Sequence, residues 1–138
     1  MATAEGRTVP FVGPEHIDVA VLETFGYEGP DQEIVTETSE FSAVCPYSGL
    51  PDFAKLTIAY TPAASCIELK SLKYYVTSFR AVGIFQEHAT ARIAEDLFKV
   101  LSPKRLTVRT LYNVRGGFET TCSVTLPAES RRAMAGTD

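Results

Sequence analysis

Two hydrophobic periods, one typical of strands and the other of helices, divide this chain into segments. Residues 33–44 and 53–61 are rich in Ile, Val, Thr, Phe and Tyr. In the second segment, Leu56, Ile58 and Tyr60 fall on one face, as expected for a strand with one buried side. We therefore predict that these two segments pair as a β-hairpin.

A second hairpin is predicted closer to the C-terminus. Residues 105–114 and 117–126 alternate between apolar and polar positions, most plainly from Phe118 to Leu126. The segment Arg115-Gly116-Gly117 joins them, and its two glycines are typical of a turn. The pattern therefore predicts four strands in two hairpins.

Between the hairpins, apolar residues recur at helical spacing. After a turn, residues 66–69 are predicted to form a short strand, followed by a helix over 71–81 that ends before Gly83. A second helix is predicted over 85–101. Its apolar stripe consists of Phe85, Ala89, Ile93, Leu97 and Leu101, spaced four residues apart.

The two ends of the chain differ from this central part. Residues 1–32 contain many Gly and Pro residues, so we predict an irregular N-terminal arm. Residues 128–138 form a polar tail whose composition is typical of disordered chain ends. The remaining residues, 33–127, are predicted to form a single α+β domain, with a four-stranded antiparallel sheet and two helices packed on one face.

Composition and charge narrow the possible functions. At 138 residues, with 45% hydrophobic and 22% charged residues, the chain fits one globular domain. It has no apolar run of the ~20 residues that a membrane helix needs, and Met1–Arg7 does not resemble a signal peptide. We expect a soluble, cytoplasmic protein that does not associate with membranes. The net charge of −4 argues against direct binding to nucleic acid.

The cysteines and histidines do not predict a disulfide framework or a metal site. Cys45, Cys66 and Cys122 are odd in number and widely spaced, with no Cys-x-x-Cys pair. His16 and His88 lie far apart and form no His-x-x-x-His motif. We expect no metal, although the sequence leaves open a site assembled from distant residues.

Cys45 is the candidate nucleophile. It lies at the end of a predicted strand, and a turn containing Pro and Gly separates it from Asp52, which opens the next apolar run. This arrangement can hold a thiol and a carboxyl group over one pocket. Taken alone, Cys45 also fits a small buried apolar residue and Asp52 a turn-capping aspartate.

A second motif favours the functional interpretation of Cys45 and Asp52 over the structural one. The segment Glu68-Leu-Lys-Ser-Leu-Lys-Tyr-Tyr75, followed by Ser78-Phe-Arg80 and Phe85-Gln-Glu-His88, contains an acid, two lysines and an aromatic pair. Together with Cys45 and Asp52, it resembles the short, single-module nitrile reductases of the QueF family over about residues 33–118. The resemblance implies the tunnelling fold, in which subunits join edge to edge into oligomeric barrels and bind a purine-like ring between them.

The resemblance also implies a reaction. Members of this family reduce 7-cyano-7-deazaguanine to its aminomethyl product with two NADPH, in the biosynthesis of queuosine for tRNA. Cys45 would attack the nitrile carbon while Asp52 protonates the nitrogen, leaving a covalent thioimide. A free thiol has a pKa of about 8.5, so the site should also supply a base or a positive field.

Substrate and cofactor residues follow from the same resemblance. Gln86, Glu87 and the segment Ile67-Glu68-Leu69 are expected to contact the substrate. Gln86 stands where many relatives have His, which makes an acid–base role at this position doubtful. The chain has no Gly-x-Gly-x-x-Gly motif, so we expect Lys70, Lys73 and Arg115 to hold NADPH, with Arg80 nearby.

The residues alone leave other interpretations open. Glu87 also fits a helix-start glutamate, and the basic residues also fit a solvated surface. Related tunnelling-fold enzymes include a pterin-pathway group and an amidine-forming group that uses the same thioimide with ammonia. A purine-binding module without catalysis is a further alternative, in which Cys45 belongs to the core.

Overall fold

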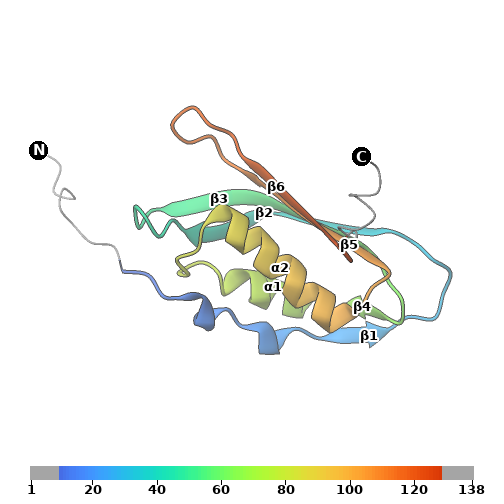
Figure 1. Cartoon of the computed structure of the whole chain (residues 1–138). Helices are drawn as coiled ribbons and strands as arrows, with labels where there is room; N and C mark the ends of the chain where they lie inside the picture. The colour runs from blue at the N-terminus through green and yellow to red at the C-terminus, as the bar shows by residue number, and fades with distance from the viewer. Residues whose placement is uncertain (1–9, 129–138) are drawn as a thin grey trace, which may run out of the picture.

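The computed structural model describes residues 10–128, whose main sheet has two helices packed on one of its faces (Figure 1). The sheet has the order β2-β3-β5-β6, and all neighbouring strands are antiparallel. Its strands are β2 (Ile34–Val44), β3 (Pro51–Thr61), β5 (Arg105–Tyr112) and β6 (Thr121–Leu126), and the helices are α1 (Leu69–Thr77) and α2 (Gln86–Leu101). The predicted α+β architecture is confirmed.

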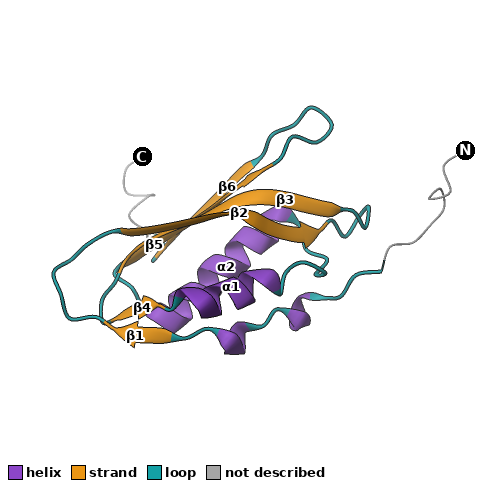
Figure 2. Cartoon of the chain, turned by 180° about the vertical axis from the view of Figure 1, so that it is seen from behind, coloured by secondary structure: helices purple, strands orange, loops and turns teal. Residues whose placement is uncertain are grey.

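The core lies between this sheet and the helices, as seen from behind in Figure 2. Leu56, Ile58 and Tyr60 are buried on the helix-facing side of β3, as their alternation predicts. The apolar stripe of α2 is also buried from Ala89 onward. Phe85 differs from the prediction, because it precedes the helix as the N-cap and its side chain is 48% exposed.

Capping and strand pairing shift the boundaries of α1 from the predicted ones. The helix begins at Leu69, because the Glu68 carboxylate accepts hydrogen bonds from the backbone N–H groups of Lys70 (2.9 Å) and Ser71 (2.8 Å). The preceding strand, β4 (Ser65–Ile67), is correspondingly shorter. The helix ends at Thr77 rather than 81, since the chain then turns toward bridges at 82–83 with Val12 and Val44.

The N-terminal segment contains more regular structure than predicted. Two 3-10 turns, Pro14–His16 and Val19–Val21, are followed by strand β1 (Thr24–Gly26), which pairs antiparallel with β4 in a second, two-stranded sheet. Ile17 is buried in the core. The prediction of an irregular arm is therefore wrong for this part, because contacts with distant residues order it. Residues 1–9 of the predicted arm and 129–138 of the predicted tail lie outside the described residues.

The β5–β6 connection is longer than the sequence predicts. Strand β6 begins at Thr121 instead of 117, and β5 ends at Tyr112 instead of 114. Gly116 and Gly117 have φ values of 55° and 84°, which side chains disfavour. The loop between the strands projects beyond the sheet at the end where β3 begins (Figure 1).

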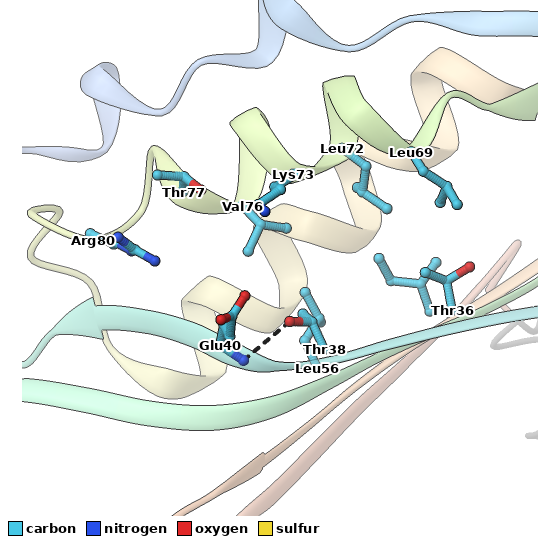
Figure 3. A pocket seen from close by; sticks show the side chains of 11 residues that line it. Thr36, Thr38, Glu40, Leu56, Leu69, Leu72, Lys73, Val76, Thr77 and Arg80 are labelled. Atoms are coloured by element: carbon cyan, nitrogen blue, oxygen red, sulfur yellow. Dashed lines mark hydrogen bonds between the residues drawn. The ribbon is translucent and has the colours of Figure 1, made fainter.

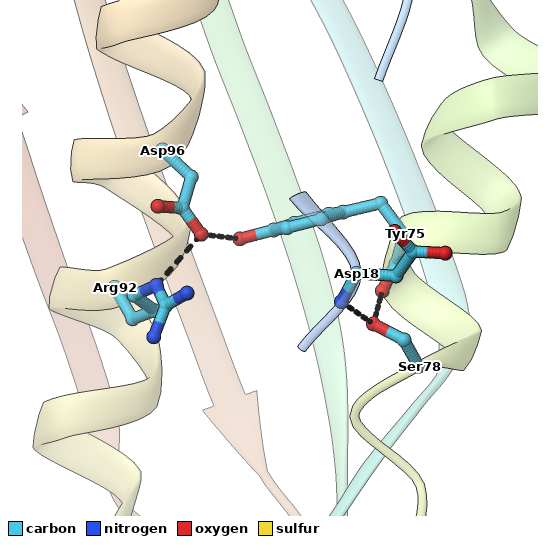
Figure 4. Close-up of polar contacts among 5 residues, drawn as sticks. All are labelled: Asp18, Tyr75, Ser78, Arg92 and Asp96. Carbon is cyan, nitrogen blue, oxygen red and sulfur yellow. Dashed lines mark hydrogen bonds and ion pairs between the residues drawn. The ribbon is translucent and has the colours of Figure 1, made fainter. Parts of the chain in front are cut away.

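A buried polar contact ties the two helices together (Figure 4). The Tyr75 hydroxyl donates to the Asp96 carboxylate at 2.7 Å, and the Arg92 guanidinium donates to the same carboxylate at 2.8 Å. Tyr75 is buried while Tyr74 is 56% exposed. Neither helix within 10–128 is long and apolar enough to span a membrane.

Candidate active site

The β2–β3 turn places Cys45 beside the start of the next strand. The backbone N–H of Cys45 donates to the Leu50 carbonyl at 2.9 Å, and its carbonyl accepts from the Gly49 N–H at 2.8 Å. Gly49 has a φ of 73°, a conformation that favours glycine. The turn sets the register that pairs Ala43 with Asp52. Cys45 and Asp52 consequently line the same cavity, of about 240 Å³.

The surroundings of Cys45 lower the pKa of its thiol. The largest cause is hydrogen bonding from the Ser48 hydroxyl, with smaller contributions from the backbone N–H groups of Ser48 and Tyr47. Partial burial and the charge of Asp52 act in the opposite direction. The turn thus supplies the donors that a thiolate needs. No sequence pattern marks Ser48 beyond its place in the turn.

Asp52 and Arg115 form an ion pair at this cavity. The Asp52 side chain is 7% exposed and the Arg115 side chain 43% exposed. One guanidinium nitrogen of Arg115 donates to a carboxylate oxygen of Asp52. Arg115, which we expected at the cofactor, therefore lies beside the candidate catalytic acid in this structure.

Gln86 and Glu87 come to the same cavity from the first turn of α2. The other lining residues are Phe85, Asn113, Phe118 and Thr120, none of which we predicted to be a site residue. Phe85 was assigned to the helix stripe, and Phe118 and Thr120 to a strand. Phe118 and Thr120 line the cavity because they lie in the loop between β5 and β6, where their apolar–polar alternation predicts a strand.

The segment Ile67-Glu68-Leu69 lies elsewhere in the subunit. It lines a different cavity, of about 360 Å³, together with Phe25, Ile34, Thr36, Tyr60 and Cys66. The Ile67 N–H donates to the Tyr60 hydroxyl at 3.0 Å. Tyr60 and Asp52 are eight residues apart on β3, which corresponds to about 26 Å. A single chain does not bring the two groups of predicted substrate residues together.

Lys73 and Arg80 border a third cavity, of about 240 Å³, between α1 and the edge strand β2 (Figure 3). Its apolar lining includes Leu56, Ile58, Leu69, Leu72 and Val76. Lys70 lies on the exposed first turn of α1. Among residues 10–128, neither of these lysines forms an ion pair with a carboxylate. Nor do the described residues include a group of three or more His, Cys, Asp or Glu side chains placed to hold a metal ion.

Comparisons with known proteins find relatives by sequence. Residues 51–131 match the family model described as QueF-like protein. The chain is 52% identical to the NADPH-dependent 7-cyano-7-deazaguanine reductase of Thermotoga petrophila, over 88% of this chain and 89% of that protein. It is 53% identical to the protein of the same name from Caldicellulosiruptor bescii, over 83% and 88%.

A solved structure shows the same fold. The apo form of the archaeosine synthase QueF-Like superimposes with a TM-score of 0.65, covering 75% of this chain and 100% of that one, at 19% sequence identity. At this identity the likeness concerns the fold alone. The family match and the relatives at about half identity over most of their length extend the likeness to the sequence. This chain belongs to the QueF-like protein family.

Proposed function

We propose that this protein is an NADPH-dependent nitrile reductase that converts 7-cyano-7-deazaguanine to 7-aminomethyl-7-deazaguanine, in queuosine biosynthesis for tRNA. The observation that carries this proposal is the convergence of Cys45, Asp52 and Glu87 on one cavity, in a chain 52% identical to reductases of that name. As part of the proposal, the enzyme works in the cytoplasm on a free small molecule, without binding nucleic acid or membranes.

Cys45 acts as the nucleophile in this proposal. Its lowered thiol pKa increases the thiolate fraction near neutral pH. The sulfur forms a bond to the nitrile carbon, and the nitrile nitrogen takes up a proton, giving a thioimide on Cys45. When bound, NADPH supplies the two hydrides that the carbon takes up in succession. After the first hydride, the bond between the substrate carbon and the sulfur would break with its electron pair on sulfur, which regenerates the Cys45 thiolate and leaves a C=N bond for the second hydride to reduce.

Asp52 moves the proton. Its carboxylate is paired with a guanidinium, so it is in the ionised form that can accept the thiol proton. Cys45 and Asp52 line one cavity. Asp52 can therefore pass the thiol proton to the nitrile nitrogen of a substrate bound there, which completes the addition. Glu87, on the first turn of α2, accepts hydrogen bonds from the amino and ring N–H groups of the purine-like edge. Gln86 can orient the substrate but cannot carry a proton.

The active site is completed by a second subunit. Ile67, Glu68 and Leu69 lie beside Tyr60, which is about 26 Å from Asp52 along β3. They can contact the same substrate as Cys45 only if they come from a neighbouring copy. Strands β2 and β6 form the two edges of the four-stranded sheet, and edge-to-edge pairing into a tunnelling-fold barrel would cover both.

The residues present fit an anionic cofactor. Lys73 and Arg80 lie at the border of an apolar cavity, with Lys70 exposed one turn away on α1. Such a cavity can take an aromatic ring while the cations pair with phosphates. Lys70, Lys73 and Arg115 are the residues that we assign to NADPH, with Arg115 reaching it after leaving Asp52.

An assay of the purified protein tests the proposal. It is mixed with 7-cyano-7-deazaguanine, NADPH and a chelator, and both cofactor absorbance and product mass are followed. We expect two NADPH to be consumed for each aminomethyl product, and none by Cys45→Ala. Cys66→Ala, which removes a thiol far from the cavity, serves as the matched control. Conversion to an amidine with ammonia, without NADPH consumption, would assign the chain to the amidine-forming alternative instead.

A further inference from the structure

Three tyrosines in the described part of the chain are almost fully buried, and they differ in their hydrogen bonding. The Tyr60 hydroxyl accepts a hydrogen bond from the Ile67 N–H, and the Tyr75 hydroxyl donates to Asp96. The Tyr112 side chain is equally buried, at 2% exposure, but its hydroxyl has no partner among residues 10–128. Buried hydroxyls are normally paired, because an unpaired one loses its bonds to water without compensation.

The unpaired hydroxyl belongs to the tyrosine beside the candidate active site. Tyr112 is the last residue of β5 and lies opposite Ala54 on β3. Asp52 is two residues before Ala54 and is buried on the same side of the sheet. Asp52 is therefore the diagonal neighbour of Tyr112, at a separation that a long aromatic side chain can span. Tyr112 and Asp52 also line one cavity together with Asn113 and Arg115.

The neighbouring hydroxyls offer Tyr112 no proton to accept. Thr90 donates its hydroxyl proton to the Gln86 carbonyl at 2.9 Å, so Thr110, 2.6 Å from the Thr90 oxygen, must donate to Thr90. Thr110 consequently has no proton to give to Tyr112. Burial is the largest cause that raises the pKa of Tyr112, followed by Cys122; the nearby Thr110 hydroxyl lowers it, and the charges of Asp52 and Glu87 raise it by less. Tyr112 thus remains protonated and is a donor.

We propose that Tyr112 is a positioning residue for Asp52, donating a hydrogen bond to its carboxylate when bound substrate separates it from Arg115. In this structure Arg115 holds the carboxylate and the Tyr112 hydroxyl is unpaired. The bond would keep one oxygen of Asp52 aimed at the proton that passes between Cys45 and the nitrile nitrogen. This inference rests on the proposed function, since it assigns a supporting role in the same reaction.

Tyr112→Phe tests the inference, because it preserves the ring and removes only the hydroxyl. The rate of thioimide formation is measured by quenched-flow mass spectrometry at saturating nitrile without NADPH, and substrate affinity is measured by titration of Cys45→Ala backgrounds. We expect adduct formation to slow about tenfold, with substrate affinity unchanged within twofold. In an Asp52→Asn background, Tyr112→Phe should have no further effect on the adduct rate, because the proton transfer that Tyr112 supports is already lost.

Tyr75→Phe is the matched control. It removes a buried hydroxyl that has a partner, Asp96, outside both cavities assigned to the reaction, so it should lower the melting temperature and leave the adduct rate unchanged. Tyr112→Phe should leave the melting temperature unchanged or raise it. An equal adduct rate in Tyr112→Phe and the parent, a loss of affinity instead of rate, or the same slowing in the Asp52→Asn background would each overturn the inference. Absence of an adduct in the parent would instead overturn the proposed function, and the role of Tyr112 with it.

Discussion

The guanidinium of Arg115 is paired with the carboxylate of Asp52 at the cavity that Cys45 also lines. The two residues are 63 positions apart, and the pair joins the loop after β5 to the start of β3. The partner of Asp52 is therefore a residue that we predicted to hold the cofactor. This contact connects the proposed proton transfer to the proposed cofactor site, and both can be tested separately.

Cys45 should form a covalent adduct with 7-cyano-7-deazaguanine even without NADPH, because addition to the nitrile precedes hydride transfer. Intact-mass analysis should show one adduct per chain in the parent protein and none in Cys45→Ala. Cys66→Ala should retain the adduct, since Cys66 is buried in the core. An adduct that persists in Cys45→Ala would remove Cys45 from its proposed role.

Ser48→Ala should raise the pKa of the Cys45 thiol, because the Ser48 hydroxyl is the largest cause that lowers it. In the parent, the rate of Cys45 alkylation should rise with pH around a midpoint below the usual 8.5 of a free thiol. In Ser48→Ala the midpoint should move upward, so that alkylation at neutral pH becomes slower. Ser123→Ala, an exposed change on β6, should leave the profile unchanged, and identical profiles for all three proteins would contradict this assignment.

Asp52→Asn should slow adduct formation by about 10²- to 10⁴-fold, because an amide keeps the shape of the side chain but cannot transfer a proton. Substrate affinity should change much less. Rapid-mixing measurements of the adduct rate, together with equilibrium titration, separate the two effects. If rate and affinity fell by the same factor, Asp52 would have a structural role only.

The enzyme should prefer NADPH to NADH because Lys70, Lys73 or Arg115 contacts the ribose phosphate that distinguishes them. A charged hydrogen bond contributes about 1.5–3 kcal/mol, so the critical alanine substitution should weaken NADPH use by roughly 10- to 150-fold. NADH use should hardly change in steady-state assays. Lys99→Ala, an exposed lysine on α2, is the control. Equal losses for both cofactors in all three variants would contradict this explanation of cofactor choice.

The active protein should be a symmetric homo-oligomer, because the predicted substrate residues of one chain lie at two distant places. Light scattering of the active fraction should give a mass above that of one 15.1 kDa chain. Val35→Lys adds a charge to an exposed position on edge strand β2 and should weaken both assembly and activity. Glu15→Lys, at an exposed position of a 3-10 turn outside the four-stranded sheet, should affect neither. A fully active monomer would contradict the shared site.

Local sequence determined the elements and the relationship of Cys45 to Asp52. The buried face of β3 follows from the hydrophobic alternation along 53–61, and the buried face of α2 follows from the stripe from Ala89 to Leu101. Both periods can be read from the sequence. The turn between Cys45 and Asp52 is short, and its register follows from its own residues and Gly49. These features were therefore predictable without long-range contacts.

Tertiary structure decided which distant segments meet. Strand β1 exists because Thr24–Gly26 meets β4 about forty residues later, and the breaker-rich sequence around it conceals this pairing. The pairing of Arg115 with Asp52, and the separation of Ile67 from Cys45, likewise depend on how the strands are ordered in the sheet. Sequence patterns report local periodicity and burial, whereas these contacts arise from the packing of distant segments, which no local period encodes.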